Sequence, residues 1–377
     1  MPIEIRGRIP FNGKTPLSDT QAGRYAAFFM QASPRSTADG QTIIRAAREQ
    51  EALGYDSSLI PTNSSRPDVW ACCGWALAAT RHLQLVGALR IGWQQPTLAA
   101  RTLATLSQLS GGRLHAHMLQ GRTDEDMRRD GDLLDKNQRY ARSEEYLHIF
   151  RQTLHGAEPF DYQGEFYRVQ GAYSAVKPVS GLRLHFPGGS AAGKALAARH
   201  ADVWAVAGTD APQIALAIDE LNALAKAGQR RLDGFWAGAF NVILAPTDEQ
   251  AWAKAAAITQ EVERFLEASQ RPSLPAHRVN SEDFPGGVLY LGLGRLTGHG
   301  PSLVGSPDSV AQAIVEYYRA GVTCITLGGL CEYQSGDGSE LITQEDRELL
   351  AHLIRLTRQH VARDDALAHT PLQRSQS

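Results

Sequence analysis

The segment FPGGSAAGK, residues 186–194, has the residue types of an anion-binding turn. An apolar run ends at Gly188 and Gly189, and Ser190 and Ala191 open a helical stretch. Glycines let an anion approach the backbone, and a helix N-terminus supplies unpaired N–H groups with a partial positive charge. The segment therefore predicts a phosphate site. The alternative is an ordinary strand–helix turn with a serine cap.

Four arginines could bind an anionic group: Arg66, Arg90, Arg122 and Arg295. The planar guanidinium suits phosphate and sulfonate oxygens, and a buried arginine needs an anionic partner. We predict that Arg66 and Arg295 act on the substrate, and a structural salt bridge is the alternative for each arginine. Asn241 lies inside an apolar run, where a buried amide must find a partner in a ligand or in the neighbouring backbone. We include Asn241 with Arg66 and Arg295 as the predicted catalytic set.

His115 and His117 alternate on one expected strand, so their side chains share a face. Such a pair could bind a metal, but no further ligand of matching spacing is visible, and core histidines are the favoured interpretation. Cys72 and Cys73 are adjacent in an apolar helical stretch, and the other two cysteines lie far away in sequence. This pattern does not suggest disulfides, and it favours reduced thiols in a cytoplasmic protein.

Short apolar runs and amphipathic stretches alternate along most of the chain, which predicts an α/β fold. The eight expected strands span 26–31, 57–62, 83–90, 114–121, 182–189, 202–208, 237–245 and 323–329. The expected helices span 39–53, 68–80, 96–110, 138–154, 191–201, 211–227, 248–269, 307–320 and 344–361. Eight repeats favour a closed (β/α)8 TIM barrel, whose reactive mouth is built at the C-terminal ends of the strands.

The 377 residues are 43% hydrophobic with a formal net charge of −2, so no basic excess favours nucleic acid or an anionic membrane. No apolar run reaches the roughly 18 residues that a membrane span needs, and the N-terminus does not resemble a signal peptide. We predict an extension over 1–22, one barrel over 23–362 with a long insertion at about 265–303 before the last strand, and a flexible tail over 363–377.

Several blocks together resemble the bacterial-luciferase-like flavin monooxygenases, and among these the FMNH2-dependent alkanesulfonate monooxygenases. The blocks lie in the family order at residues 53–70, 83–121, 129–150, 186–204 and 303–329. The resemblance implies a barrel with a reduced flavin at its mouth, a separate NAD(P)H:FMN reductase, and O2 captured as a flavin C4a-(hydro)peroxide. For an alkanesulfonate, the products would be an aldehyde and sulfite. A homodimer or homotetramer is expected.

The resemblance also implies residue roles. Ser190 and Ala191, with Gly189, would hold the FMN phosphate. Tyr140 would face the ring or the phosphate, and Arg295 would bind the substrate anion from a mobile insertion. The remaining predicted cofactor residues are Thr62, Ala88, Leu89 and Gln120, of which the last three would lie against the flavin ring.

The substrate side departs from the sulfonate pattern. Sulfonate oxygenases of this type carry a cysteine where this chain has Arg66, and an arginine and a histidine where it has Ala239 and Asn241. They carry a tyrosine near the position of Leu330, for which Tyr333 is a substitute. Another organosulfur or small anionic substrate is therefore equally consistent. Two further alternatives are a deazaflavin (F420) oxidoreductase and a flavin-binding protein without turnover.

Overall fold

The computed structural model describes residues 3–10, 20, 22, 38–121, 123–269, 278–328 and 343–363. Within these residues, eight strands form a closed barrel in the order β1-β13-β9-β8-β7-β4-β3-β2. Their bounds are β1 Glu4–Arg8, β2 Ser57–Ile60, β3 Gln84–Arg90, β4 Leu114–Leu119, β7 Leu184–Pro187, β8 Val203–Ala207, β9 Gly234–Gly238 and β13 Cys324–Thr326. The predicted (β/α)8 barrel is confirmed.

Helices follow most of the barrel strands in sequence, as expected for this fold. Their bounds are α2 Gly40–Leu53, α3 Val69–Ala79, α4 Pro96–Leu109, α5 Asp124–Arg129, α6 Lys136–His155, α7 Ala191–His200, α8 Ala211–Ala227, α11 Pro307–Arg319 and α12 Gln344–Arg363. Their ends follow local rules. Gly54 closes α2 in the left-handed conformation with φ 92°, and Ser306 caps α11 ahead of a proline. None of the described helices is long and apolar enough to cross a membrane.

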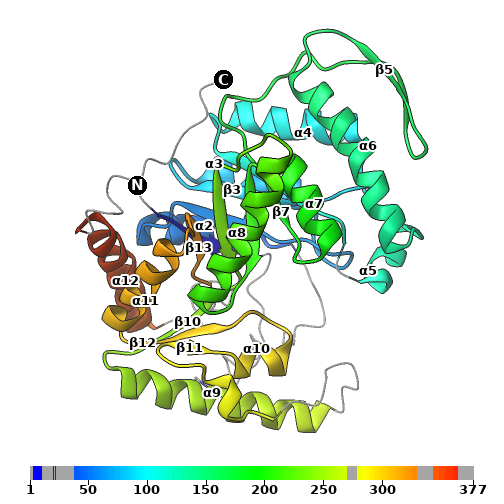
Figure 1. The fold of residues 1–377 in the computed structure, drawn as a ribbon. Coiled ribbons are helices and arrows are strands. Elements are labelled where there is room, and N and C mark those ends of the chain that lie inside the picture. Colours follow the sequence, from blue (N-terminus) through cyan, green and yellow to red (C-terminus); the bar gives the residue numbers. More distant parts are fainter. Residues whose placement is uncertain are drawn as a thin grey trace. The chain divides into compact units, whose positions relative to one another are not determined.

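The chain forms two compact units, one of residues 1–58, 206–220 and 233–377 and the other of residues 59–205 and 221–232. In the second unit, α4 and α6 pack against each other, and the hairpin of β5 (Phe160–Gln163) and β6 (Arg168–Ala172) follows α6 (Figure 1). In the first unit, α9 (Asp248–Ser269) lies along a sheet of order β10-β12-β11 (Figure 1).

The predicted extension over 1–22 needs correction, because β1 is a barrel strand that pairs in parallel with β13. Its sequence, EIRGR, is mostly polar and lacks the apolar run that is expected of a barrel strand. Arg6 is fully buried, donates to Ser57 Oγ at 2.8 Å and to Glu4 at 2.6 Å, and stacks over Trp236. A polar strand can therefore lie in the barrel because Ser57 and Trp236 on other strands, together with Glu4 on β1, supply partners for Arg6. The strand expected over 26–31 lies outside the described residues.

The strand expected over 237–245 is two strands. β9 ends at Gly238, and β10 (Asn241–Leu244) leaves the barrel to pair with β12 (Ser302–Gly305). Between them Ala239 adopts φ 68°, a left-handed conformation that breaks a strand. The insertion before β13 therefore begins at β10. Its other elements are η1 Ser281–Asp283, β11 Leu289–Tyr290 and α10 Gly292–Thr297.

Candidate active site

The N-terminus of α7, residues 190–193, has the geometry of an anion-binding site, which we call the anion seat. Ser190 is the N-cap, and its side-chain oxygen accepts from the Gly193 backbone N–H at 3.2 Å. The first bond of the helix runs from Lys194 N to Ser190 O at 2.8 Å. The N–H groups of Ala191 and Ala192 precede that bond, and both residues are exposed. These two donors are therefore the ones that a phosphate at this helix end would meet.

The two glycines before the cap have different roles. Gly188 has φ +128°, and a Cβ on it would lie 3.1 Å from Gly193 Cα, so its backbone packs directly on the first turn of α7. A Cβ on Gly189 would meet nothing within 4 Å, and this residue is exposed. Gly188 thus serves the packing of the turn, while Gly189 borders open space beside the helix end.

Tyr140 reaches the same helix end from α6. Its hydroxyl lies 3.4 Å from Ser190 Oγ, and a Cβ on Gly193 would lie 3.1 Å from it. A capping box of Asp135 and Gln138 fixes the start of α6 one turn earlier. The structure therefore brings the predicted Tyr140 and Ser190 together.

Trp204 on β8 was not among the predicted site residues. Its indole N–H donates to the Gly188 carbonyl at 3.3 Å and so supports the turn below the anion seat. The available signal was general, because a buried tryptophan N–H usually finds a partner.

The residues predicted against the flavin ring lie on adjacent strands. Ala88 and Leu89 are each 2% exposed on β3, which pairs in parallel with β4. Gln120 directly follows β4, and its Nε2 is buried with no hydrogen-bond partner among the described residues. A buried amide without a partner is costly, so this donor is available to a ligand.

Arg90 ends β3 and is only 2% exposed. Its guanidinium pairs with Asp126, lies 3.4 Å from Asp130, and stacks over Trp93 at 3.9 Å from the ring centroid. The structural salt bridge, the alternative considered above, therefore accounts for this arginine. Arg122 lies outside the described residues.

Asp126 also holds the loop after β2, because Ser64 donates to it from both its backbone N–H and its hydroxyl. Burial raises the pKa of Asp126, but the hydrogen bonds from Ser64 and the charge of Arg90 outweigh it and leave the pKa below its usual value. Thr62 and Arg66 lie in this loop and are half-buried. Their predicted roles stay predictions.

In the other compact unit, Asn241 is 2% exposed. Its side-chain oxygen accepts from Arg8 at 2.9 Å, and its amide nitrogen donates to the Gly300 carbonyl at 3.4 Å. Asn241 is the first residue of β10, and protein groups bond both the oxygen and the nitrogen of its side-chain amide.

Arg295 lies on α10, with its side chain 40% exposed. It donates at 2.7 Å to Asp283, whose side chain is fully buried. This pairing favours the structural salt bridge for Arg295, and its predicted contact with a substrate anion stays a prediction.

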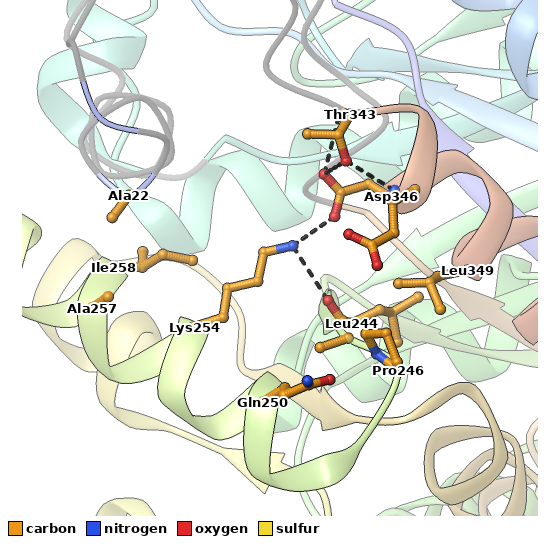
Figure 2. Close-up of a pocket in the computed structure, with 12 residues that line it drawn as sticks. Ala22, Leu244, Pro246, Gln250, Lys254, Ala257, Ile258, Thr343, Asp346 and Leu349 are labelled. Carbon is orange, nitrogen blue, oxygen red and sulfur yellow. Dashed lines mark hydrogen bonds and ion pairs between the residues drawn. The ribbon is translucent and has the colours of Figure 1, made fainter.

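A cavity of ≈ 430 Å³ is lined by residues of α9, of the start of α12 and of the end of β10, and none of its lining residues is a predicted site residue (Figure 2). Its polar wall is an ion pair, in which Lys254 donates to Asp346 and to the Leu244 carbonyl (Figure 2). Thr343 donates to the same carboxylate from its N–H and its hydroxyl. These groups join α9 to the start of α12, which is a structural role.

Comparison with known proteins adds to this geometry. A model of the luciferase-like monooxygenase family matches residues 21–324. The chain belongs to this family. The predicted family resemblance is thereby confirmed, and alkanesulfonate specificity stays a prediction.

Solved structures share the fold at low sequence identity. A riboflavin lyase (RcaE), solved with modified FMN and its substrate riboflavin, is 19% identical over 95% of this chain and 92% of its own, with a TM-score of 0.69. The EDTA monooxygenase of Chelativorans sp. BNC1 is 17% identical over 92% and 93%, with a TM-score of 0.68. The coenzyme F420-dependent tetrahydromethanopterin reductase of Methanopyrus kandleri is 17% identical over 85% and 96%, with a TM-score of 0.62.

Proposed function

We propose that this chain is the oxygenase component of a two-component monooxygenase, which receives FMNH2 from a separate NAD(P)H:FMN reductase. The observation that carries the proposal is the anion seat at α7, where Ser190, Tyr140 and the open side of Gly189 meet at a helix N-terminus. Family membership supports FMN as the molecule whose phosphate binds there. NAD(P)H itself would act only on the reductase.

The residues present are compatible with FMN. The N–H groups of Ala191 and Ala192 and the hydroxyls of Ser190 and Tyr140 are the donors for the phosphate. The buried, unpartnered Nε2 of Gln120 is a donor for a carbonyl of the ring. When bound, FMNH2 supplies the two electrons that activation of O2 requires. The protein's part is to hold the ring and to exclude water.

As substrate we propose a small organosulfur anion, with an alkanesulfonate as the first compound to test. One alkanesulfonate RCH2SO3−, one O2 and one FMNH2 give the aldehyde RCHO, bisulfite, FMN and water. The C–S bond breaks, one oxygen atom enters the aldehyde, and the other leaves as water. FMNH2 and the substrate carbon each give two electrons to O2.

Of the predicted catalytic residues, we propose Arg66 as the one that binds the sulfonate. It is half-buried in the loop after β2, which Asp126 holds in place. An arginine suits a sulfonate because its fork can donate two parallel hydrogen bonds.

The test supplies FMNH2 from a purified reductase and measures O2 uptake and sulfite release with short alkanesulfonates, sulfones and other small organosulfur compounds. We expect micromolar affinity for FMNH2 and sulfite release that requires both FMNH2 and O2. Arg66→Ala should raise KM about tenfold or more, as the loss of a charged hydrogen bond predicts. Arg101→Ala, on the exposed face of α4, is the matched control. No measurable affinity for FMNH2 would refute the proposal.

A second candidate is hydride transfer with deazaflavin F420, because the F420-dependent reductase shares this fold. This reaction would need no O2. Binding of F420 in preference to FMN, with substrate reduction under anaerobic conditions, would favour it over oxygenation.

A further inference from the structure

One face of the β3–β4 pair carries a histidine next to the expected flavin ring. Gln84 Oε1 lies 3.0 Å from His115 Nε2, so Gln84 on β3 and His115 on β4 share a face. Side chains alternate along strands, so Ala88 and His117 lie on that same face. The parallel register pairs these two residues directly.

This face points into the barrel. A Cβ on Gly87 would lie 2.9 Å from the Trp70 side chain and 3.1 Å from Cys73 Sγ, both on α3. Gly87 therefore faces the helix layer, and its neighbour Ala88 faces the opposite way. His117 follows Ala88 and is directed toward the interior, two residues before the end of β4.

Other titratable groups lie around His117 on its own and the neighbouring strands. On β4, His115 Nδ1 accepts from the Arg183 backbone N–H at 3.1 Å, which leaves the proton on Nε2 to be donated to Gln84. On β7, His185 pairs in register with His117 but is fully buried. On β3, Arg90 lies beyond Ala88 and is neutralised by the carboxylates described above. His117 is 8% exposed, against 3% for His115 and 0% for His185.

We propose that His117 contacts the flavin ring and exchanges a proton with it or with the bound substrate. Ala88 carries only a methyl side chain on β3, and the register places His117 directly beside it on the same face. A histidine changes its charge near neutral pH, which suits general acid–base catalysis. This inference rests on the proposed function, since it requires a flavin at Ala88.

The test compares His117→Asn with the full-length protein. His148→Asn, the same change on the exposed face of α6, is the matched control. The absorbance spectrum of bound oxidised FMN is recorded from about pH 5 to pH 9, and kcat and KM follow with FMNH2 supplied. We expect a one-proton spectral transition in the unsubstituted protein and in His148→Asn, and its loss in His117→Asn. We also expect kcat to fall about 100-fold or more with a small change in KM.

A second variant, His117→Gln, is closer to histidine in length and keeps the test usable should His117→Asn not fold. Either folded variant that binds FMN, keeps the spectral transition and keeps kcat within about twofold would overturn the inference. Failure of the unsubstituted protein to bind FMN would instead overturn the proposed function, and this inference with it.

Discussion

Gly188→Ala and Gly189→Ala, made separately, should change different properties of the turn before α7. The first should lower thermal stability, and the second should weaken the binding of FMN. Gly188 has φ +128°, a conformation that costs an L-residue on the order of 1–3 kcal/mol, and its new Cβ would lie 3.1 Å from the Gly193 backbone. We therefore expect Gly188→Ala to lower the melting temperature by on the order of 1–4 °C.

Gly189→Ala should have the opposite profile. Its backbone is outside the left-handed region, and its new methyl group would meet nothing within 4 Å, so stability should change by less than about 0.5 kcal/mol. If the FMN phosphate occupies that open space, the methyl group pushes the phosphate away, and one hydrogen bond to this charged group is lost. Such a bond contributes about 1.5–3 kcal/mol, so Kd for FMN should rise about tenfold to 100-fold.

The assay pairs thermal melts without ligand with titration of FMN fluorescence. Gly111→Ala at the end of α4 is the control, because it has φ +67° but nothing within 4 Å of the new Cβ. It should cost about 1 kcal/mol and leave FMN affinity unchanged. An unchanged Kd in Gly189→Ala would refute the phosphate seat, and an unchanged melting temperature in Gly188→Ala would refute the strain argument.

Three further predictions follow from the same contacts. Ser190→Asp should keep the helix cap and thermal stability, yet its charge should repel the phosphate and weaken FMN binding at least about tenfold. Ser190→Ala removes the cap and should lower the free energy of unfolding, measured by thermal melting, by about 1 kcal/mol. Asp126→Asn should cost about 3 kcal/mol in denaturant unfolding, because it weakens the pairing of buried Arg90. Since the pKa of Asp126 is lowered, its contribution is present above the usual carboxylate pKa and is lost as pH falls through the lowered value, so the variant should lose less stability in acid. Arg295→Ala should lower stability with KM unchanged because it removes the cation that pairs with buried Asp283, and a raised KM with unchanged stability would return Arg295 to the substrate.

Several parts of the site could be predicted locally. The start of α7 at Ser190 followed from a serine cap after glycines, and that chemistry depends only on neighbours in the chain. The proximity of Tyr140 to Ser190 was expected only from the family resemblance, because 50 residues separate them. The partners of Arg90 could not be predicted locally either, since the two carboxylates that bind it lie 36 and 40 residues further along the chain.

The sequence by itself determined the class of fold, because alternating strand and helix periodicity is a local property and implies parallel strands covered by helices. It also determined the cap at Ser190. Only the tertiary structure decided which polar residues are available to ligands. Arg6 is buried in a barrel strand, and Asn241 and Arg295 are paired within the protein, because their partners lie far away in sequence. The same long-range packing brought His117 beside Ala88 through strand register, which no local pattern specifies.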